Sequence, residues 1–185
     1  MAVGVVLAPH SFVVEHEFPG VADSKKLTER KREALYELLE QRAQKGDLQF
    51  CVRFSSSLYI DTYGIVPAVR RAAWSGVREL AAPADTFVKL DGLLKAPPEY
   101  AQETIVHGDA LVPIISLASV AAKVTRDRLM QKIDKKYPGY GFAEHKGYGT
   151  KAHLCALQML GLCEIHRRSF CKSVANSFDD TRARV

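Results

Sequence analysis

Short apolar runs alternate along this chain with longer segments whose apolar residues recur at helical spacing. Val3 to Leu7, Leu48 to Phe54 and Thr86 to Leu90 have the length and composition of strands, and Glu103 to Val106 predicts another. A further extended piece is expected at Phe12 to Val14. Because these strands alternate with helical segments, the pattern predicts an α/β or α+β layered fold.

Helices are expected in the intervening segments. A helix from Thr28 to Gly46 has a capping residue at its start, and Pro67 suits the first turn of the next helix. Apolar spacing predicts a long helix from Pro113 to about Lys136 and a last helix from Thr150 to Leu160. The glycine-rich stretch between Pro138 and Gly149 predicts a loop.

Length and composition favour one compact domain. The 185 residues are 47% hydrophobic and 25% charged, with no repeat or low-complexity tract, so we expect a single domain over residues 1–174 and a disordered tail over 175–185. The apolar opening from Met1 to Ala8 is far shorter than the roughly 20 residues of a membrane span and follows no basic residues. We therefore expect a cytoplasmic monomer that does not bind a membrane. The net charge of +5 suits a polyanionic partner.

Cysteine and histidine residues gather near the C-terminal end. None of the four cysteines forms a CxxC pair, and we expect reduced thiols. Zinc is an alternative, but the spacings do not match those of paired zinc ligands. Core thiols and hydrogen-bonded histidines are the favoured interpretation for His153, Cys155, Cys163, His166 and Cys171.

Two aspartates could carry chemistry. Asp91 ends a predicted strand and precedes Gly92, where open α/β sheets present ligands, although Asp-Gly is also a common turn. Asp127 falls within the long predicted helix, where a pair with Lys123 one turn earlier is the simpler explanation. Spacing alone favours the turn and the ion pair.

Basic residues and an aromatic ring could contact a nucleic acid. Ser24, Lys25 and Lys26 lie just before a predicted helix, a place suited to phosphate, but they are equally typical of a solvated charge run. Lys146 and Tyr148 stand among glycines that would let a polymer backbone approach. Tyr148 could stack on a base or a sugar, or could be a half-buried packing residue.

Several short motifs follow one another in a characteristic order. They are Asp23–Leu27, Lys31–Glu33, Tyr59–Asp61 with Gly64–Ile65, Asp91–Gly92, Gly108–Ala110, Ala122–Arg128, His145–Thr150 and His166–Phe170. In this order they resemble type 2 ribonuclease H, the bacterial ribonuclease HII family, from Met1 to about Lys172. Each motif alone is weak evidence for the family, whereas the ordered set is specific to it.

The resemblance implies a fold, a reaction and a set of residues. It implies an RNase H-like mixed sheet flanked by helices, with a C-terminal helical extension. It also implies two-metal hydrolysis, with Mg²⁺ or Mn²⁺, of RNA in RNA–DNA hybrids and at ribonucleotides embedded in DNA, leaving 5′-phosphate ends. Asp91 and Asp127 correspond to two of four catalytic, metal-binding carboxylates. The residues expected to bind nucleic acid are Ser24, Lys25, Lys26, Arg126, Lys146 and Tyr148.

One part of the family pattern is absent from these 185 residues. The family has a first strand ending in Asp-Glu-Ala-Gly-Arg-Gly, which supplies the other two carboxylates and a loop that senses the ribose 2′-hydroxyl. In an RNase H-like sheet this strand is the central one. Either the start was assigned at an internal codon or the chain is a shortened product, and a catalytically impaired hybrid-binding fragment is the alternative function. A structural α/β domain without a polyanionic partner would require its basic residues to be scattered.

Overall fold

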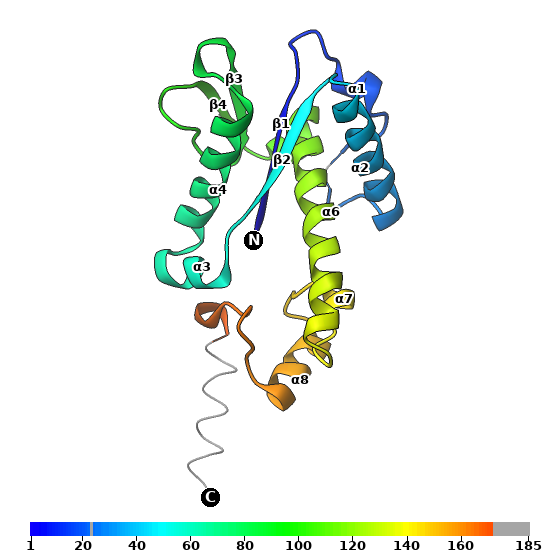
Figure 1. The fold of residues 1–185 in the computed structure, drawn as a ribbon, viewed down its shortest axis with the longest axis vertical. Helices are drawn as coiled ribbons and strands as arrows, with labels where there is room; N and C mark the ends of the chain where they lie inside the picture. The colour runs from blue at the N-terminus through cyan, green and yellow to red at the C-terminus, as the bar shows by residue number, and fades with distance from the viewer. Residues whose placement is uncertain (23, 172–185) are drawn as a thin grey trace, which may run out of the picture. The chain divides into compact units, whose positions relative to one another are not determined.

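The chain folds into two compact units. The computed structural model describes residues 1–22 and 24–171. One unit, the strand unit, comprises Met1–Phe54 and Val66–Thr125. The other, the helical unit, comprises Ser55–Ile65 and Arg126–Val185, and its described part ends at Cys171. Figure 1 follows the chain through both units.

The strand unit contains two small sheets. β1 (Ala2–Leu7) pairs antiparallel with β2 (Gln49–Phe54), and β3 (Phe87–Asp91) pairs parallel with β4 (Ala101–Ile105). Among the described residues each strand has one hydrogen-bonded neighbour, so there are two two-stranded sheets. Each of β1 and β3 therefore has one edge without a strand partner in the described structure.

Helices surround these strands and make up most of the helical unit. In chain order they are α1 (Val14–Glu17), α2 (Glu29–Gln44), α3 (Ser57–Tyr63), α4 (Ile65–Leu80), α5 (Gly108–Leu111), α6 (Pro113–Lys136), α7 (Phe142–His145) and α8 (Lys151–Leu160), with short 3₁₀ turns at η1 (Pro83–Asp85) and η2 (Arg168–Phe170). The long helix α6 contributes its first part to the strand unit and its last part to the helical unit.

The main core of the strand unit lies between α2 and α6. Thr28 caps α2, because its hydroxyl accepts a hydrogen bond from the Lys31 amide at 3.3 Å. Leu39 on α2 and Leu117 on α6 are fully buried in this core, together with Val124 at 2% exposure. Burying each such side chain contributes about 1.5–3 kcal/mol before conformational entropy is counted, and this contribution fixes α2 against α6.

β1 lies between α4 and α6 (Figure 1), and the absence of a side chain at two glycines makes this possible. A Cβ built at Gly4 would lie 2.1 Å from the Ala118 carbonyl oxygen of α6. A Cβ at Gly76 of α4 would lie 2.7 Å from a Val5 methyl group. Since Gly4 and Val5 are consecutive, alternate faces of β1 meet the two helices.

A second core cluster joins α4 to β3. It consists of Val77, Leu90, Ala96 and Tyr100, and Val5 of β1 packs against it. The Tyr100 hydroxyl donates to the Ala81 carbonyl at 2.7 Å, so its polar end is satisfied where the ring is buried. Both sheets of the strand unit thus share apolar contacts with α4 even though no backbone pairing joins them among the described residues.

The helical unit has its own core of aromatic and apolar residues. Tyr140, Phe142, Ala156 and Leu157 are buried in it, and Met130 from the last part of α6 packs against them. The rings of Tyr140 and Phe142 stack with centroids 5.1 Å apart and planes 7° apart. Thr150 caps α8 by accepting from the His153 amide at 3.2 Å, as its place before the helix predicts.

The described structure confirms the predicted strands and the four long helices, and α6 begins and ends at the predicted residues. The expectation of an extended piece at Phe12 to Val14 was wrong, because the chain turns there and α1 begins at Val14. The predicted loop from Pro138 to Gly149 contains α7, and α3 is a further helix that the sequence did not predict. Ser56 caps α3 by accepting from the Tyr59 amide at 3.1 Å, and Gly141 opens α7 with φ at 76°.

The expected tail over 175–185 lies outside the described residues. Of the helices in the described part of the chain, none has the length and apolar composition that crossing a bilayer would require.

The contact at Gly4 generates a stability prediction. Gly4→Ala places a methyl group on the α6 backbone, and overpacking of this kind costs about 1–3 kcal/mol. We expect a clear fall in the midpoint of urea unfolding. Gly149→Ala is the matched control, because a Cβ there meets nothing within 4 Å. Equal midpoints for Gly4→Ala and the parent would show that β1 does not approach α6 this closely.

Candidate functional site

Asp91 lies at the carboxyl end of β3, where the chain turns away from the sheet. The Gly92 amide closes this turn by donating to the Ile105 carbonyl at 2.9 Å, and Gly92 has φ at 67°. The Asp91 carboxylate accepts from the Asp109 amide at 3.4 Å, at the start of α5. Gly108 permits this approach, because a Cβ there would lie 3.5 Å from the Asp91 carboxylate and 2.8 Å from an Ile115 methyl group.

A second carboxylate, Asp109, lies beside Asp91 and holds a lysine. Asp109 is 9% exposed, and its Oδ2 accepts from the Lys25 ammonium at 3.1 Å. The Lys25 side chain is 78% exposed, so the ammonium stays at the surface while it neutralises a nearly buried charge. The motif Gly108–Ala110 pointed to this segment, but the sequence assigned no role to Asp109.

Ser24 and Lys26 differ sharply in exposure. Ser24 is 3% exposed, and its hydroxyl hydrogen-bonds the Ser119 hydroxyl of α6 at 2.8 Å. Its carbonyl accepts from the Arg32 guanidinium at 3.0 Å. The structure therefore uses Ser24 to fix the segment before α2, whereas Lys26 is exposed.

The helical unit brings four of the predicted residues together. The Arg126 guanidinium donates to the Lys146 carbonyl at 2.7 Å and lies over the Tyr148 ring, 4.8 Å from its centroid. Its Nη1 is 3.8 Å from the Asp127 carboxylate, which is buried at 5% exposure. Tyr148 itself is 55% exposed. An exposed ring, a guanidinium and a carboxylate thus lie within one small group of residues, which we call the Arg126 cluster: Arg126, Asp127, Lys146 and Tyr148.

Lys146 is oriented differently from a surface lysine. It has φ at 52°, it is 9% exposed, and its ammonium donates to the Ala143 carbonyl. A phosphate contact by Lys146 would require the ammonium to leave this carbonyl. In the structure as it stands, Lys146 supports the cluster through its backbone, while Lys25 and Lys26 present charge at the surface of the strand unit.

Asp91 and Asp127 belong to different units, and each is described within its own unit. Their oxygen donors are of the kind that Mg²⁺ and Mn²⁺ prefer. Within residues 1–22 and 24–171, however, no group of three or more His, Cys, Asp or Glu side chains could hold a metal ion.

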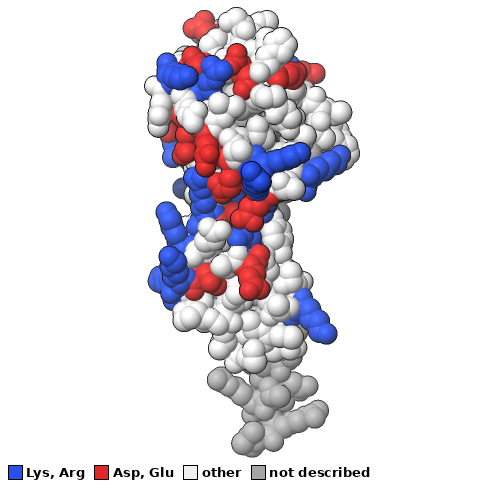
Figure 2. Space-filling view, turned by 90° about the vertical axis from the view of Figure 1, so that its right-hand side faces the viewer, with Lys and Arg blue, Asp and Glu red and all other residues white. Residues whose placement is uncertain are grey.

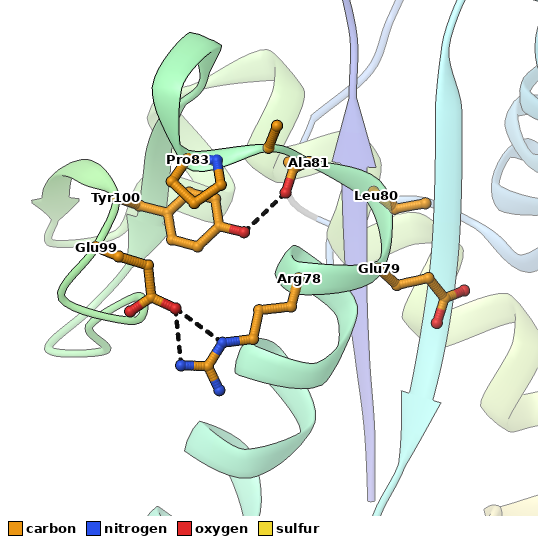
Figure 3. Close-up of a pocket in the computed structure, with 8 residues that line it drawn as sticks. Arg78, Glu79, Leu80, Ala81, Pro83, Glu99 and Tyr100 are labelled. Carbon is orange, nitrogen blue, oxygen red and sulfur yellow. Dashed lines mark hydrogen bonds and ion pairs between the residues drawn. The ribbon is translucent and has the colours of Figure 1, made fainter.

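Two features of the described surface, its charge on one face and a pocket, lie apart from the predicted site residues. Figure 2 shows acidic and basic side chains interleaved on one face rather than a continuous basic field. A pocket at the end of α4, shown in Figure 3, holds the Arg78–Glu99 ion pair at 2.8 Å and the Tyr100 hydroxyl. None of its lining residues is among the predicted site residues.

Asp61 is a residue whose role the sequence did not reveal. Its carboxylate accepts from the backbone amides of Arg168 and Ser169 at 2.8 and 3.0 Å and from the Ser169 hydroxyl. These bonds fix the start of η2 to α3. The hydrogen bond from the Ser169 hydroxyl is the main reason that the pKa of Asp61 lies below its ordinary value. The only signal in the sequence was that both segments belong to the ordered motifs.

Comparison with solved structures defines the class of protein. The chain resembles the ribonuclease H2 from Pyrococcus horikoshii OT3, with a TM-score of 0.66 and 21% identity over 97% of this chain and 99% of that chain. It also resembles a chain in the structure of the PCNA:RNase HII complex from Archaeoglobus fulgidus, with a TM-score of 0.70 and 20% identity over 95% and 87% of the two chains. The fold is the α/β fold of these ribonucleases.

Sequence comparison narrows the class to one family. The family model for ribonuclease HII matches residues 1–173. Ribonuclease HII of Geobacter metallireducens is 46% identical over 154 residues, and that of Ruminiclostridium cellulolyticum is 41% identical over 173 residues. The chain belongs to the ribonuclease HII family. The matches cover 83% and 94% of this chain but 70% and 64% of the two relatives.

The contacts of Asp61 generate a prediction about η2. Asp61→Asn weakens the acceptor for two amides and a hydroxyl, so hydrogen exchange at Arg168 and Ser169 should become faster. Acid should weaken the same contacts: because folding lowers the pKa of Asp61, the stabilisation is present at neutral pH and is lost as pH falls through that lowered pKa, so the protection of these amides relative to their intrinsic exchange rate should fall. Exchange read by mass spectrometry checks this expectation.

Asp134→Asn is the control for this experiment, since Asp134 is a carboxylate of the same unit that makes no hydrogen bond among the described residues. Unchanged exchange at Arg168 in the Asp61→Asn protein would mean that these contacts do not hold η2.

Proposed function

We propose that this chain acts as an endoribonuclease on RNA in RNA–DNA hybrids and at single ribonucleotides embedded in duplex DNA. The Arg126 cluster is the observation that carries the proposal. It offers an exposed ring for stacking, a cation for a phosphate and, beside them, a carboxylate. Membership of the ribonuclease HII family supports the same reaction class.

Asp91 and Asp127 are proposed as catalytic carboxylates that bind Mg²⁺ or Mn²⁺. A divalent ion supplies a nucleophilic water and stabilises the leaving oxygen when bound. Two carboxylates are fewer ligands than two such ions need. The site in these residues is therefore half of the proposed one.

Nucleic-acid contacts are proposed for residues in both units. In the helical unit, Tyr148 would stack on the ribose-containing step, and Arg126 holds the ring from one face. In the strand unit, the exposed ammonium groups of Lys25 and Lys26 are suited to phosphate contacts. The pairing of Lys25 with Asp109 sets the position of one of these charges.

A strand between β1 and β3 is proposed to complete the site. Each of these strands pairs on one side only, while Val5 of β1 packs against the cluster that contains Leu90 of β3. A strand hydrogen-bonded to both would join the two sheets and satisfy their free edges. A segment ending in Asp-Glu-Ala-Gly-Arg-Gly and preceding β1 would place two further carboxylates at this sheet.

Hybrid binding without cleavage is the alternative function for the 185 residues. The Arg126 cluster supports it, because an exposed ring beside a guanidinium could bind a duplex without a metal ion. Both functions predict binding, and they differ in the rate of cleavage with Mg²⁺ or Mn²⁺ present.

The carboxylate assignment makes a direct prediction. Asp91→Asn and Asp127→Asn each remove a charged ligand and preserve size, so cleavage should fall by orders of magnitude while binding persists. The assay uses a duplex with one ribonucleotide and a version of the chain that carries the upstream motif. Asp134→Asn is the control. Near-normal turnover by Asp91→Asn would remove that residue from the site.

The stacking role of Tyr148 makes a second prediction. Tyr148→Phe keeps the ring face, and Tyr148→Ala removes it together with the contact to Arg126. Loss of a stacked base costs about 1–3 kcal/mol, so Tyr148→Ala should weaken binding about tenfold or more and Tyr148→Phe should change it little. Fluorescence anisotropy with a labelled duplex measures both. Equal losses would point to the hydroxyl group instead of the ring.

The proposed strand makes a stability prediction. A version of the chain extended upstream through Asp-Glu-Ala-Gly-Arg-Gly should melt several degrees higher, because a strand paired on both edges adds backbone hydrogen bonds and buried area. Thermal melts of both versions provide the measurement. Equal melting temperatures would contradict a strand between β1 and β3.

A further inference from the structure

Three of the six histidines are buried together in the helical unit. His145, His153 and His166 are 9%, 5% and 8% exposed, whereas the remaining histidines are at the surface of the strand unit. The rings of His145 and His153 stack with centroids 4.3 Å apart, and the Nε2 atoms of His153 and His166 are 3.2 Å apart. We call these three residues the histidine relay.

The hydrogen bonds of the relay determine where each proton lies. The Tyr148 carbonyl can only accept, so the His153 Nδ1 at 2.9 Å must carry a proton. A neutral His153 then accepts at Nε2, which makes the His166 Nε2 the donor. The His166 Nδ1 is left as an acceptor, and it meets the Cys163 amide at 3.0 Å. The Cys163 thiol and carbonyl lie at 3.1 and 3.3 Å from the same nitrogen.

His145 has the same neutral arrangement. Its Nε2 faces the Tyr140 carbonyl at 2.8 Å and must donate, while its Nδ1 accepts from the Gly147 amide at 3.1 Å. Each of the three rings therefore uses one nitrogen as donor and the other as acceptor. A second proton on any ring would bring two N–H groups face to face and lose a hydrogen bond.

The relay holds the backbone that carries Tyr148. His153 binds the Tyr148 carbonyl, His145 binds the Gly147 amide, and the Tyr148 amide donates to the His145 carbonyl at 2.9 Å. Lys146 has φ at 52°, a conformation that residues with a side chain rarely adopt, so this turn needs such support. The relay and Arg126 thus tether neighbouring atoms of one short segment.

We propose that the neutral histidine relay positions Tyr148 for nucleic-acid binding and makes that binding fail in acid. The proposal rests on the proposed function and deepens it, because it assigns a positioning role to three residues that do not touch the duplex. It also predicts the sign of the pH effect. Protonation of surface groups makes a protein more positive and strengthens binding to a polyanion, whereas protonation of the relay weakens binding.

The surroundings of His153 and His166 favour their neutral forms. Burial is the main cause that lowers the pKa of His153 and of His166, and each is lowered further by a neighbouring imidazole. Two other titratable residues lie next to the rings. The Cys163 thiol contacts the Nδ1 atom of His166, and the ring centroid of Tyr140 lies 5.3 Å from that of His166. Among the described residues, no carboxylate forms a hydrogen bond or an ion pair with these three rings.

The sign of the stability effect follows from these shifts. A histidine whose pKa is lowered by folding contributes its full stabilisation above the ordinary pKa of 6.5 and loses it as pH falls below that value. If nucleic-acid binding requires one group to be unprotonated, the affinity falls by up to about tenfold for each unit by which the pH drops below the pKa of that group. Binding should therefore weaken as the pH falls through the lowered pKa values of His153 and His166 in the folded protein, which lie below 6.5.

The experiment measures the affinity of the 185-residue chain for a duplex with one ribonucleotide from pH 8 to pH 5 at fixed salt. A thermal melt at each pH confirms that the protein is folded. The parent should bind more weakly in acid. His153→Asn keeps an amide donor for the Tyr148 carbonyl and cannot titrate, so it should bind at pH 8 within about threefold of the parent and show a flatter pH profile. His16→Asn, an exposed histidine of α1, should behave as the parent does.

A double-mutant cycle distinguishes positioning from a merely structural role. His153→Ala should weaken binding at pH 8 in the parent and have no further effect in the Tyr148→Ala protein, because it acts through that ring. Additive losses would overturn the positioning role. Binding that stays constant or tightens down to pH 5 would overturn the inference and leave the proposed function intact. No binding at pH 8 in the parent would overturn both.

Discussion

The contact of β1 with α6 at Gly4 is the constraint on which the strand unit depends. Only a residue without a Cβ lets the strand reach the Ala118 carbonyl of the helix. This approach places α6 so that Leu117 packs beneath α2 and Ser119 meets Ser24. The segment that carries Lys25 is thus anchored to the same helix through Ser24. Lys25 in turn pairs with Asp109. The position of Lys25 in the strand unit therefore depends on a packing requirement in the first strand.

Further along α6, Arg126 plays the corresponding part in the helical unit. Its guanidinium binds the Lys146 carbonyl and covers one face of Tyr148, while the histidine relay holds the adjacent amide and carbonyl groups. Several tethers on a turn of a few residues reduce the entropy that the turn would lose on binding a ligand. The exposed ring is thus preorganised by groups that are themselves buried or partly buried.

Local signals in the sequence were sufficient to predict most of the helices and strands. Thr28 and Thr150 marked helix starts, and the apolar spacing of α6 gave both of its ends. The extended segment expected at Phe12 to Val14 became the start of α1, because the tertiary packing of Val14 outweighed its strand propensity. The pairings of Asp109 with Lys25 and of Asp61 with η2 join residues far apart in sequence, and no local pattern encodes them. The inward orientation of Lys146 likewise depends on a positive φ that its residue type does not favour.

Among the described residues, β1 and β3 each have one edge without a strand partner, and we propose that a strand bound to both would complete the sheet and bring two carboxylates to Asp91. The most direct test is the rate of cleavage of a duplex with one ribonucleotide, with Mg²⁺ or Mn²⁺, by the 185-residue chain and by a version extended through Asp-Glu-Ala-Gly-Arg-Gly. Our account predicts that the extended version cleaves orders of magnitude faster and leaves 5′-phosphate ends. Equal rates for the two versions would contradict it.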